Sequence, residues 1–189
     1  MRMREADSLV LPLPRQRPAR RRGDAALLRA IDRGDEAALA ELFTRHWPAA
    51  HRAAWLVSHD AQAAEDIAQE AFLAVLQRLD RFDRARPFGP WLHRIVVNRA
   101  IDFVRARTAR REVDGAAAPE PAAREPAALD DDTLAALARL GPEQRAVVVL
   151  RHLLGYTPGQ IAGLLDLPRG TVNSRLRRAL DALAEELDP

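Results

Sequence analysis

Residues 154–183 read LGYTPGQIAGLLDLPRGTVNSRLRRALDAL. Thr157 followed by Pro158 predicts a helix start, because the hydroxyl can cap free backbone amides and proline suits the first helical turn. Pro168 predicts a break, since the residue before a proline is pushed out of helical geometry. A second helix is then expected from about Arg169 to Leu183. Two short helices across a tight turn form a helix-turn-helix, whose second helix can enter a DNA major groove.

The second predicted helix has one apolar side and one polar side. Hydroxyls, an amide and guanidinium groups on the polar side are the groups that read base edges and hold phosphates. The alternative is a solvated, arginine-rich face on an ordinary helical hairpin. The residues expected to be buried are Val172, Leu176, Leu180 and Leu183, and those expected on the exposed side are Gly170, Thr171, Asn173, Ser174, Arg175, Arg177 and Arg178.

The composition favours an all-α protein of small helical packing units, because alanine is abundant and aromatic residues make up only 5% of the 189 residues. The formal net charge is +2, and all 29 basic residues are arginine. The chain has no cysteine, which excludes disulfides and thiolate zinc sites. No apolar run approaches the ~20 residues that a membrane span needs, and no signal peptide is recognised. We therefore expect a cytoplasmic protein.

The charge and proline patterns divide the chain into two small helical domains joined by a flexible acidic linker. Residues 1–22 carry seven arginines and three prolines and are expected to be a disordered arm. Residues 23–111 form the first expected domain, in which Asp24 and Asp35 cap helices. Residues 112–132 are rich in alanine, proline and acidic residues, which predicts a linker that leaves the relative placement of the domains free. Residues 133–189 form the second domain, with the helix-turn-helix.

The expected helix at residues 64–79, AEDIAQEAFLAVLQRL, carries a polar stripe opposite its apolar stripe. Asp66, Gln69 and Glu70 surround Leu73 on this stripe. An apolar residue flanked by carboxylates suits a docking surface for a basic partner. A solvated acidic face with one exposed leucine is an equally good interpretation.

Aromatic and basic residues alternate in residues 80–90, DRFDRARPFGP, which are expected to form a loop. The rings of Phe82 and Phe88, which lie among arginines, could stack on unpaired nucleic-acid bases. Alternatively, both rings could pack in the hydrophobic core and anchor the loop. The following helix, expected over residues 91–111, presents a polar stripe and ends in positive charge. This pattern indicates a surface that follows a phosphate backbone.

Three histidines in the first domain raise the question of a metal site. The spacings of His46, His51 and His59 match no standard pair of ligands on one helical face, and no carboxylate completes a set. We therefore expect neither a metal ion nor a cofactor. Without a glycine-rich phosphate loop or a convergent set of titratable groups, the sequence also gives no indication of an enzyme.

Taken together, these stretches resemble the extracytoplasmic-function group of bacterial sigma factors, over about residues 35–111 and 133–184. AEDIAQEAFLAVLQ resembles the helix of that family that binds core RNA polymerase. FGPWLHRIVVNRAIDFVR resembles its segment for opening and reading the minus-10 promoter element. LGPEQRAVVVLRHLLGYTPGQIAGLLDLPRGTVNSRLRRAL resembles its domain for the minus-35 element. The order of the three motifs across an acidic linker matches the family.

The resemblance implies a promoter-specificity subunit without catalytic residues, with core RNA polymerase, promoter DNA and an anti-sigma factor, possibly membrane-anchored, as partners. It implies that Asp66, Gln69, Glu70 and Leu73 dock on the clamp helices of the largest polymerase subunit. For the minus-10 element it implies Asp80, Phe82, Phe88, Trp91, Arg94, Asn98, Arg99 and Arg105. For the minus-35 element it implies Thr171, Asn173, Ser174, Arg175, Arg177 and Arg178. Neither a small-molecule substrate nor membrane insertion is expected.

The alternative is a stand-alone helix-turn-helix regulator, whose N-terminal helices would dimerise or sense a ligand. Such a regulator binds duplex DNA unaided, normally as a dimer on paired half-sites. A sigma factor is expected to bind duplex DNA weakly until polymerase is added.

Overall fold

The computed structural model describes residues 23–114 and 129–187, and the residues described there form helices and connecting turns without a strand. The expected all-α class is confirmed. The predicted N-terminal arm and most of the predicted linker lie outside the described residues. The N-terminal group consists of α1 (Asp24–Ile31), α2 (Glu36–Ser58), α3 (Ala61–Leu76), the short 3-10 turn η1 (Leu79–Arg81) and α4 (Phe88–Asp114). The C-terminal group consists of α5 (Asp131–Arg139), α6 (Pro142–Val148), the π-helical turn η2 (Val149–Leu153), α7 (Pro158–Leu165) and α8 (Arg169–Leu187).

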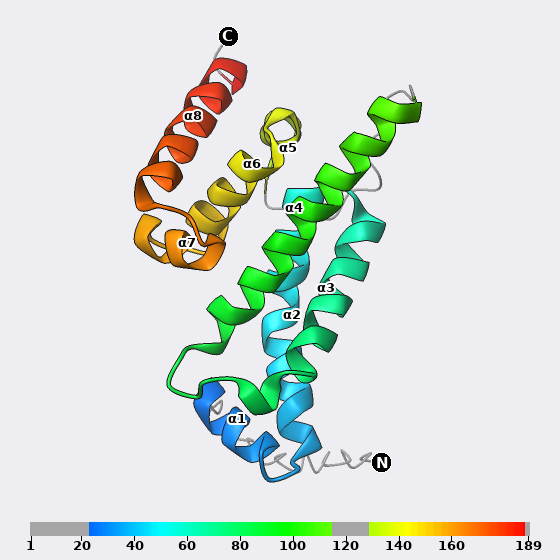
Figure 1. Ribbon diagram of the computed structural model, residues 1–189, viewed down its shortest axis with the longest axis vertical. Coiled ribbons are helices and arrows are strands. Elements are labelled where there is room, and N and C mark those ends of the chain that lie inside the picture. Colours follow the sequence, from blue (N-terminus) through cyan, green and yellow to red (C-terminus); the bar gives the residue numbers. More distant parts are fainter. Residues whose placement is uncertain (1–22, 115–128, 188–189) are drawn as a thin grey trace, which may run out of the picture.

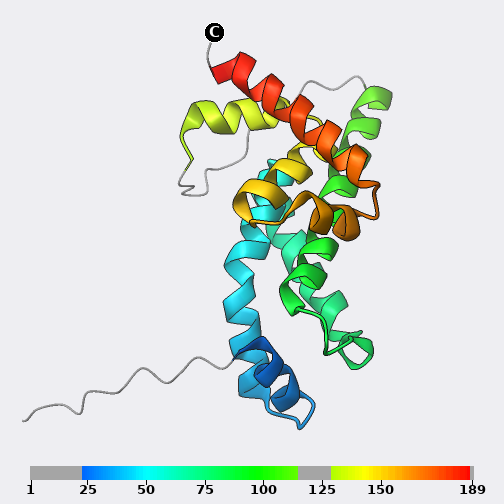
Figure 2. The same ribbon diagram turned by 90° about the vertical axis from the view of Figure 1, so that its left-hand side faces the viewer.

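Three long helices, α2, α3 and α4, run alongside one another, and the C-terminal helices lie against α4 and the end of α2 (Figures 1 and 2). Local sequence explains two of the helix starts. Asp35 and Asp60 each accept a hydrogen bond from a backbone amide three residues later, at 3.0 Å, as N-caps of α2 and α3. Asp24 was expected to cap α1, but the cap position is Gly23. Asp24 lies in the first turn, and its carboxylate bonds instead to side chains of α2.

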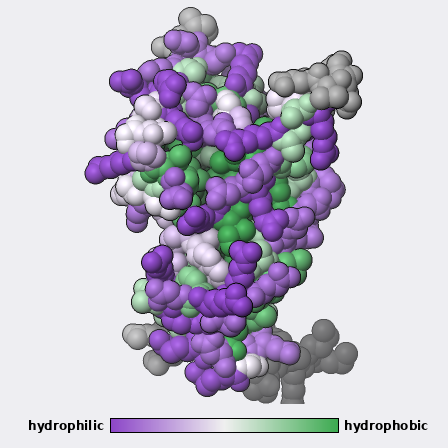
Figure 3. Space-filling view, viewed as in Figure 1, coloured by the Kyte–Doolittle hydropathy of each residue, from purple (hydrophilic) through white to green (hydrophobic). Residues whose placement is uncertain are grey.

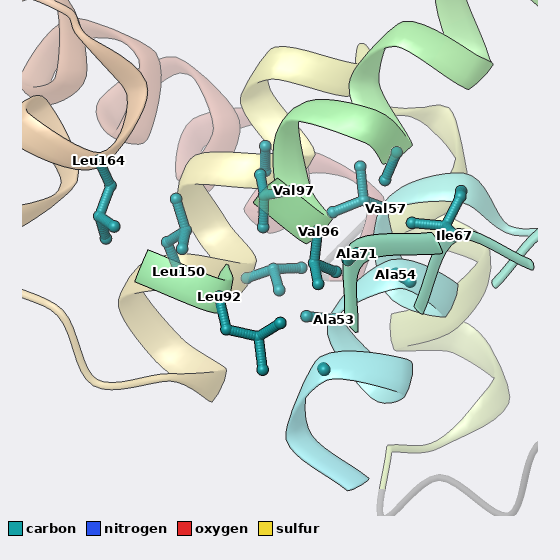
Figure 4. Close-up of a cluster of buried hydrophobic side chains, with 14 of the residues drawn as sticks. Ala53, Ala54, Val57, Ile67, Ala71, Leu92, Val96, Val97, Leu150 and Leu164 are labelled. Carbon is teal, nitrogen blue, oxygen red and sulfur yellow. The ribbon is translucent and has the colours of Figure 1, made fainter. Parts of the chain in front are cut away.

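Small residues allow the three helices to pack closely. Ala53 and Ala54 of α2 and Ala71 of α3 are fully buried, and Val96 of α4 lies among them (Figure 4). An alanine at a helix contact brings the two backbones closer than a larger side chain would. The abundance of alanine therefore serves packing in this group.

The region expected as a loop over residues 80–90 is shorter than predicted. η1 occupies its beginning, and α4 starts at Phe88, three residues before the expected start at Trp91. Phe88 is 2% exposed and Phe82 is 9% exposed, and Phe82 stacks on Trp91 with 4.4 Å between ring centroids. Both phenylalanines thus lie in the core, which is one of the two interpretations that the sequence left open.

The helix-turn-helix has the predicted starts. The Thr157 hydroxyl accepts from the Gln160 amide, and the Gln160 side chain accepts from the Thr157 amide in return, which forms a capping box at α7. Asp166 ends α7 in the left-handed region, at φ 54°. On α8 the expected burial of Leu180 is wrong, because this side chain is 44% exposed, whereas Ala179 is fully buried.

The two groups contact each other directly in this structure. A guanidinium nitrogen of Arg145 in α6 donates to the Val57 carbonyl of α2 at 2.6 Å. Nδ1 of His93 in α4 and the Tyr156 hydroxyl share a hydrogen bond of 2.8 Å. Between these contacts the apolar core is continuous from one group to the other.

Candidate nucleic-acid and partner interfaces

The exposed side of α8 presents the groups that the sequence predicted for DNA. Asn173, Arg177 and Arg178 are exposed, and Thr171, Ser174 and Arg175 are half-buried. The Ser174 hydroxyl donates to the Thr171 carbonyl at 2.9 Å, so its oxygen remains able to accept from a base or a water. Arg178 donates to the Ser174 carbonyl at 3.3 Å, which holds the start of its side chain along the helix. The arrangement offers several donors along one side of a helix, as readout in a major groove requires.

The predicted docking stripe on α3 is a continuous exposed surface. Its four residues, Asp66, Gln69, Glu70 and Leu73, are all exposed, and Leu73 is 57% accessible. Glu70 also forms an ion pair with Arg99 of α4. This ion pair joins a residue predicted for polymerase docking to one predicted for the minus-10 element. Leu76 was not predicted for this stripe, but it is 37% exposed and lies one turn beyond Leu73; the spacing of three residues was the available signal.

A cavity of about 680 Å³ lies between the first turns of α4 and helix α7. Trp91 and Arg94 contribute to its wall from α4, and Phe82 contributes from the preceding segment. The structure therefore brings together three of the eight residues predicted for the minus-10 element. Asp80, Phe88, Asn98, Arg99 and Arg105 lie outside the lining. The complete lining is Arg78, Arg81, Phe82, Asp83, Arg86, Pro87, Pro90, Trp91, Arg94, Tyr156, Gln160, Gly163 and Leu164.

The cavity is electropositive, because Arg78, Arg81, Arg86 and Arg94 line it together with a single carboxylate, Asp83. Asp83 is itself 3.4 Å from Arg86. Sequence reasoning did not select the first three arginines, although their density in residues 78–86 was visible. Guanidiniums beside the half-buried ring of Trp91 can hold a phosphate and a base of a single strand.

Buried polar groups occupy the junction between the two helical groups. Burial lowers the pKa of His93 to about 4, with a smaller contribution from nearby His46, and burial raises the pKa of the Tyr156 hydroxyl to about 12. Burial also lowers the pKa of His59 to about 4, assisted by the charges of Arg145 and Arg107. Both histidines are therefore neutral at physiological pH.

These histidines predict a pH dependence of stability. His93 takes up a proton near pH 6.5 in the unfolded chain, but only near pH 4 in the folded chain. Its stabilising contribution is complete above pH 6.5 and is lost as the pH falls through this window. For a fully buried histidine such a shift corresponds to about 3 kcal/mol. Between about pH 7 and about pH 5 the expected loss is about 2 kcal/mol of this total, and urea unfolding at the two pH values measures it. His93→Phe is expected to flatten the dependence, whereas substitution of the exposed His152 is not; equal slopes for wild type and His93→Phe would contradict the assignment.

The three histidines considered for metal binding each contact a different residue. His46 Nε2 is 2.8 Å from an Asp24 oxygen, His51 stacks on Trp47, and His59 packs on Trp55. Within residues 23–114 and 129–187, no three histidines or carboxylates cluster as a metal site would require. In the same ranges, no helix combines the length and apolar character needed to cross a membrane.

Comparison with known proteins accounts for both helical groups. A family model described as Sigma-70 region 2 matches residues 42–110, and one described as Sigma-70, region 4 matches residues 131–183. The ECF RNA polymerase sigma factor SigM of Mycobacterium tuberculosis is 37% identical over 171 residues, which cover 88% of this chain and 85% of that protein. The ECF RNA polymerase sigma-E factor of Escherichia coli is 31% identical over 184 residues, with coverage of 88% and 95%.

Solved structures agree. Sigma factor RpoE of Bartonella quintana, in complex with the anti-sigma factor NepR, matches with a TM-score of 0.69 and 25% identity, over 80% of this chain and 98% of that chain. CnrH, in complex with the cytosolic domain of CnrY, matches with a TM-score of 0.66 and 30% identity, over 87% and 97%. The fold and the matched regions define the class as that of sigma-70 proteins. The chain belongs to the extracytoplasmic-function (ECF) sigma factors of this family, as its motifs had indicated.

Proposed function

We propose that this chain directs core RNA polymerase to a dedicated set of promoters through three separate surfaces. The stripe Asp66, Gln69, Glu70 and Leu73 docks on polymerase, the start of α4 holds the melted minus-10 strand, and the exposed side of α8 reads the minus-35 element. The observation that carries the proposal is the presence of two basic surfaces and one acidic docking stripe on regions that match sigma regions 2 and 4 in the family order.

The residues predicted for the minus-10 element have different proposed roles. Trp91 and Arg94 reach the cavity, and Asn98 lies one turn further along α4, so these side chains can follow a strand along one side of the helix. Asp80 is exposed and lies in the chain between Arg78 and Arg81, which both line the cavity. Phe82 and Phe88 support this surface from the core, since their rings are too buried to stack on a base without rearrangement. Arg99 and Arg105 carry charge along α4 while engaged in ion pairs with Glu70 and Glu143.

The chain needs no catalytic group for this function, because the polymerase performs the chemistry. Contacts at two DNA elements offset the cost of unstacking a base, which is a few kcal/mol. We further propose a cytoplasmic location, where core polymerase works, and regulation by an anti-sigma factor. The solved structure of sigma factor RpoE, bound to the anti-sigma factor NepR, supports this last partner. The domain division at residues 23–111 and 133–189 belongs to the same proposal.

Run-off transcription over a fragmented genomic DNA library, with and without this protein, tests the function. Purified core polymerase is expected to produce new start sites only when the protein is present, and these starts should share two spaced upstream motifs. A stand-alone regulator predicts the opposite pattern, with no new starts and unaided binding to a palindromic duplex.

Arg178 provides a test of the upstream surface. Arg178→Ala is expected to weaken recognition of the minus-35 element by roughly 1–3 kcal/mol if the guanidinium contacts a base edge. The measurement is holoenzyme binding to a recovered promoter and to the same promoter with its upstream element scrambled. The variant should lose the difference between the two fragments. Arg139→Ala, at an exposed arginine of the same domain, is the control, and equal discrimination by both variants would remove Arg178 from the reading surface.

A further inference from the structure

The segment that connects α3 to α4 has two sides with different partners. Arg81, Asp83 and Arg86 line the electropositive cavity proposed to hold the minus-10 strand. Arg84 points instead to the end of α1, where its Nε donates to one carboxylate oxygen of Asp32 at 3.2 Å and its Nη2 donates to the other. In Figure 1 the segment lies between the start of α4 and α1. The segment therefore presents charge to the cavity on one side and is attached to α1 on the other.

The ion pair between Arg84 and Asp32, which we call the α1 tether, fixes both the position and the orientation of the arginine. Two parallel N–H···O bonds match the fork of the guanidinium to the carboxylate. The guanidinium carbon also lies 5.8 Å from the centroid of the Phe82 ring, and Phe82 is held in the core by stacking on Trp91. The Arg84 side chain is only 29% exposed. It is thus held between a carboxylate of α1 and a buried ring.

Helix α1 provides a firm support for the tether. It packs on α2, with Leu28 buried in the core. At its start, the two carboxylate oxygens of Asp24 bond to Arg45 at 2.7 Å and to His46 at 2.8 Å. Asp32 is the C-cap of the helix, and its backbone amide donates to the Leu28 carbonyl at 3.0 Å. The backbone position of Asp32 is therefore set by the N-terminal core.

The part of the segment that faces the cavity is a short polar turn. The Asp83 side chain accepts from the Ala85 amide at 3.0 Å, and the Asp83 carbonyl accepts from the Arg86 amide at 3.0 Å. These bonds determine the local shape of the turn but not its place relative to the helices. The space-filling view shows mainly hydrophilic residues over α1 and the adjoining connection, at the lower end of this face (Figure 3). Little apolar area anchors the turn there, so its placement depends on the α1 tether.

We propose that Asp32 and Arg84 are positioning residues for the minus-10 element, and that the α1 tether holds the segment in the arrangement that presents Arg81 and Arg86 to the melted strand. The inference rests on the proposed sigma function. It gives α1 a part in promoter opening, although the matching region 2 model begins at residue 42, beyond the end of α1. A preformed segment avoids the cost of ordering when the strand binds, so loss of the tether lowers strand opening and leaves attachment to polymerase intact.

Asp32→Asn separates positioning from a direct effect of charge. It removes a negative charge beside the strand surface, so electrostatics alone predicts tighter strand binding, whereas loss of the tether predicts weaker opening. We expect about fivefold weaker opening, which corresponds to about 1 kcal/mol, the upper end for an exposed ion pair. A fluorescent adenine analogue in the minus-10 element of a recovered promoter measures opening by the holoenzyme. Glu36→Gln, at an exposed carboxylate in the first turn of α2, is the matched control, and both variants should bind core polymerase as wild type does.

Arg84→Lys distinguishes a positioning arginine from one that contacts the strand. Lysine keeps the charge but loses the forked geometry that the carboxylate requires. The variant is expected to lose about as much opening as Asp32→Asn, and the double variant no more than either single one, because all three lack the same contact. Unchanged or stronger opening with Asp32→Asn would overturn the proposal, whatever Arg84→Lys does.

Amide hydrogen exchange in the free chain distinguishes failure of this inference from failure of the sigma function. The amides of Ala85 and Arg86 should exchange about fivefold faster in Asp32→Asn than in Glu36→Gln, since the segment opens more often without the tether. Equal exchange would refute the tether, and faster exchange with wild-type promoter opening would refute the positioning role. If exchange responds as expected but the wild-type holoenzyme produces no new start sites, the sigma function is wrong and the positioning role falls with it, whereas the tether itself is confirmed.

Discussion

Charge reversal of the α3 stripe, Asp66→Arg with Glu70→Arg, is expected to abolish co-purification with core polymerase. Both side chains are exposed, so the fold does not depend on burying them, and the carboxylates flank an accessible Leu73. An acidic interface that meets a basic partner loses its attraction and gains like-charge contacts, and such juxtapositions cost several kcal/mol. We expect at least a hundredfold loss of affinity, which corresponds to about 2.8 kcal/mol.

The control for this variant is Asp181→Arg with Glu185→Arg on α8. Both residues are exposed, they have the same four-residue spacing, and the net charge changes equally. Loss of the Glu70–Arg99 ion pair is expected to matter little for folding, since exposed ion pairs contribute 0–1 kcal/mol. Circular dichroism should therefore show unchanged helicity in both variants. Normal co-purification of the α3 variant at wild-type helicity would exclude this stripe as the docking surface.

Local signals in the sequence predicted the helix-turn-helix well. Thr157 and Gln160 lie three residues apart, so the capping box depends on almost nothing outside its own turn. The start of α4 was mispredicted for a related reason. Proline and glycine in PFGP suggested a loop, but Pro90 lies in the first turn of the helix, where the missing amide has no intrahelical partner to lose.

The buried side of α8 was predicted only in part, because the prediction placed the leucines at its centre. Val172, Leu176 and Ala179 define the buried centre, and Leu180 lies near the edge of the apolar arc. The spacing of apolar residues indicates which side of the helix is apolar, whereas the neighbouring helices determine which part of that side is buried. The surface residues of α8 and α3 were predictable, since exposure follows from the opposite side of each wheel.

The junction between the domains could not be predicted, because it depends on contacts between residues far apart in the sequence. Arg145 and Val57 are 88 positions apart, and His93 and Tyr156 are 63 apart. An arginine in residues 142–148 has no local feature that distinguishes it from a solvated one. A long linker also permits many placements, so only the packing of α6 and α7 on α4 selects this one.

Arg145 gives the second large expected effect. Its guanidinium donates to four carbonyl oxygens, those of Leu137, Ala138, Leu140 and Val57, at 2.6–2.9 Å. Three of these carbonyls end α5 or follow it, where a helix has no intrahelical donors left. Burial lowers the pKa of Arg145 to about 10, yet the group stays charged near neutral pH. The side chain therefore satisfies the end of α5 and joins it to α2.

Arg145→Met keeps an unbranched side chain that can pack in place of the arginine stem, and it removes every donor. Several buried carbonyls would lose their partner, at about 1–3 kcal/mol each before water or local shifts compensate. We expect a loss of roughly 3–5 kcal/mol in the free energy of unfolding, a large share of the 5–15 kcal/mol typical of folded domains. Urea unfolding followed by circular dichroism measures it. Arg139→Met, at a side chain that is 66% exposed and paired with Glu186, should change stability by less than about 1 kcal/mol. Equal stabilities of the two variants would show that water replaces the buried guanidinium, and that α5 and α2 are not held together through it.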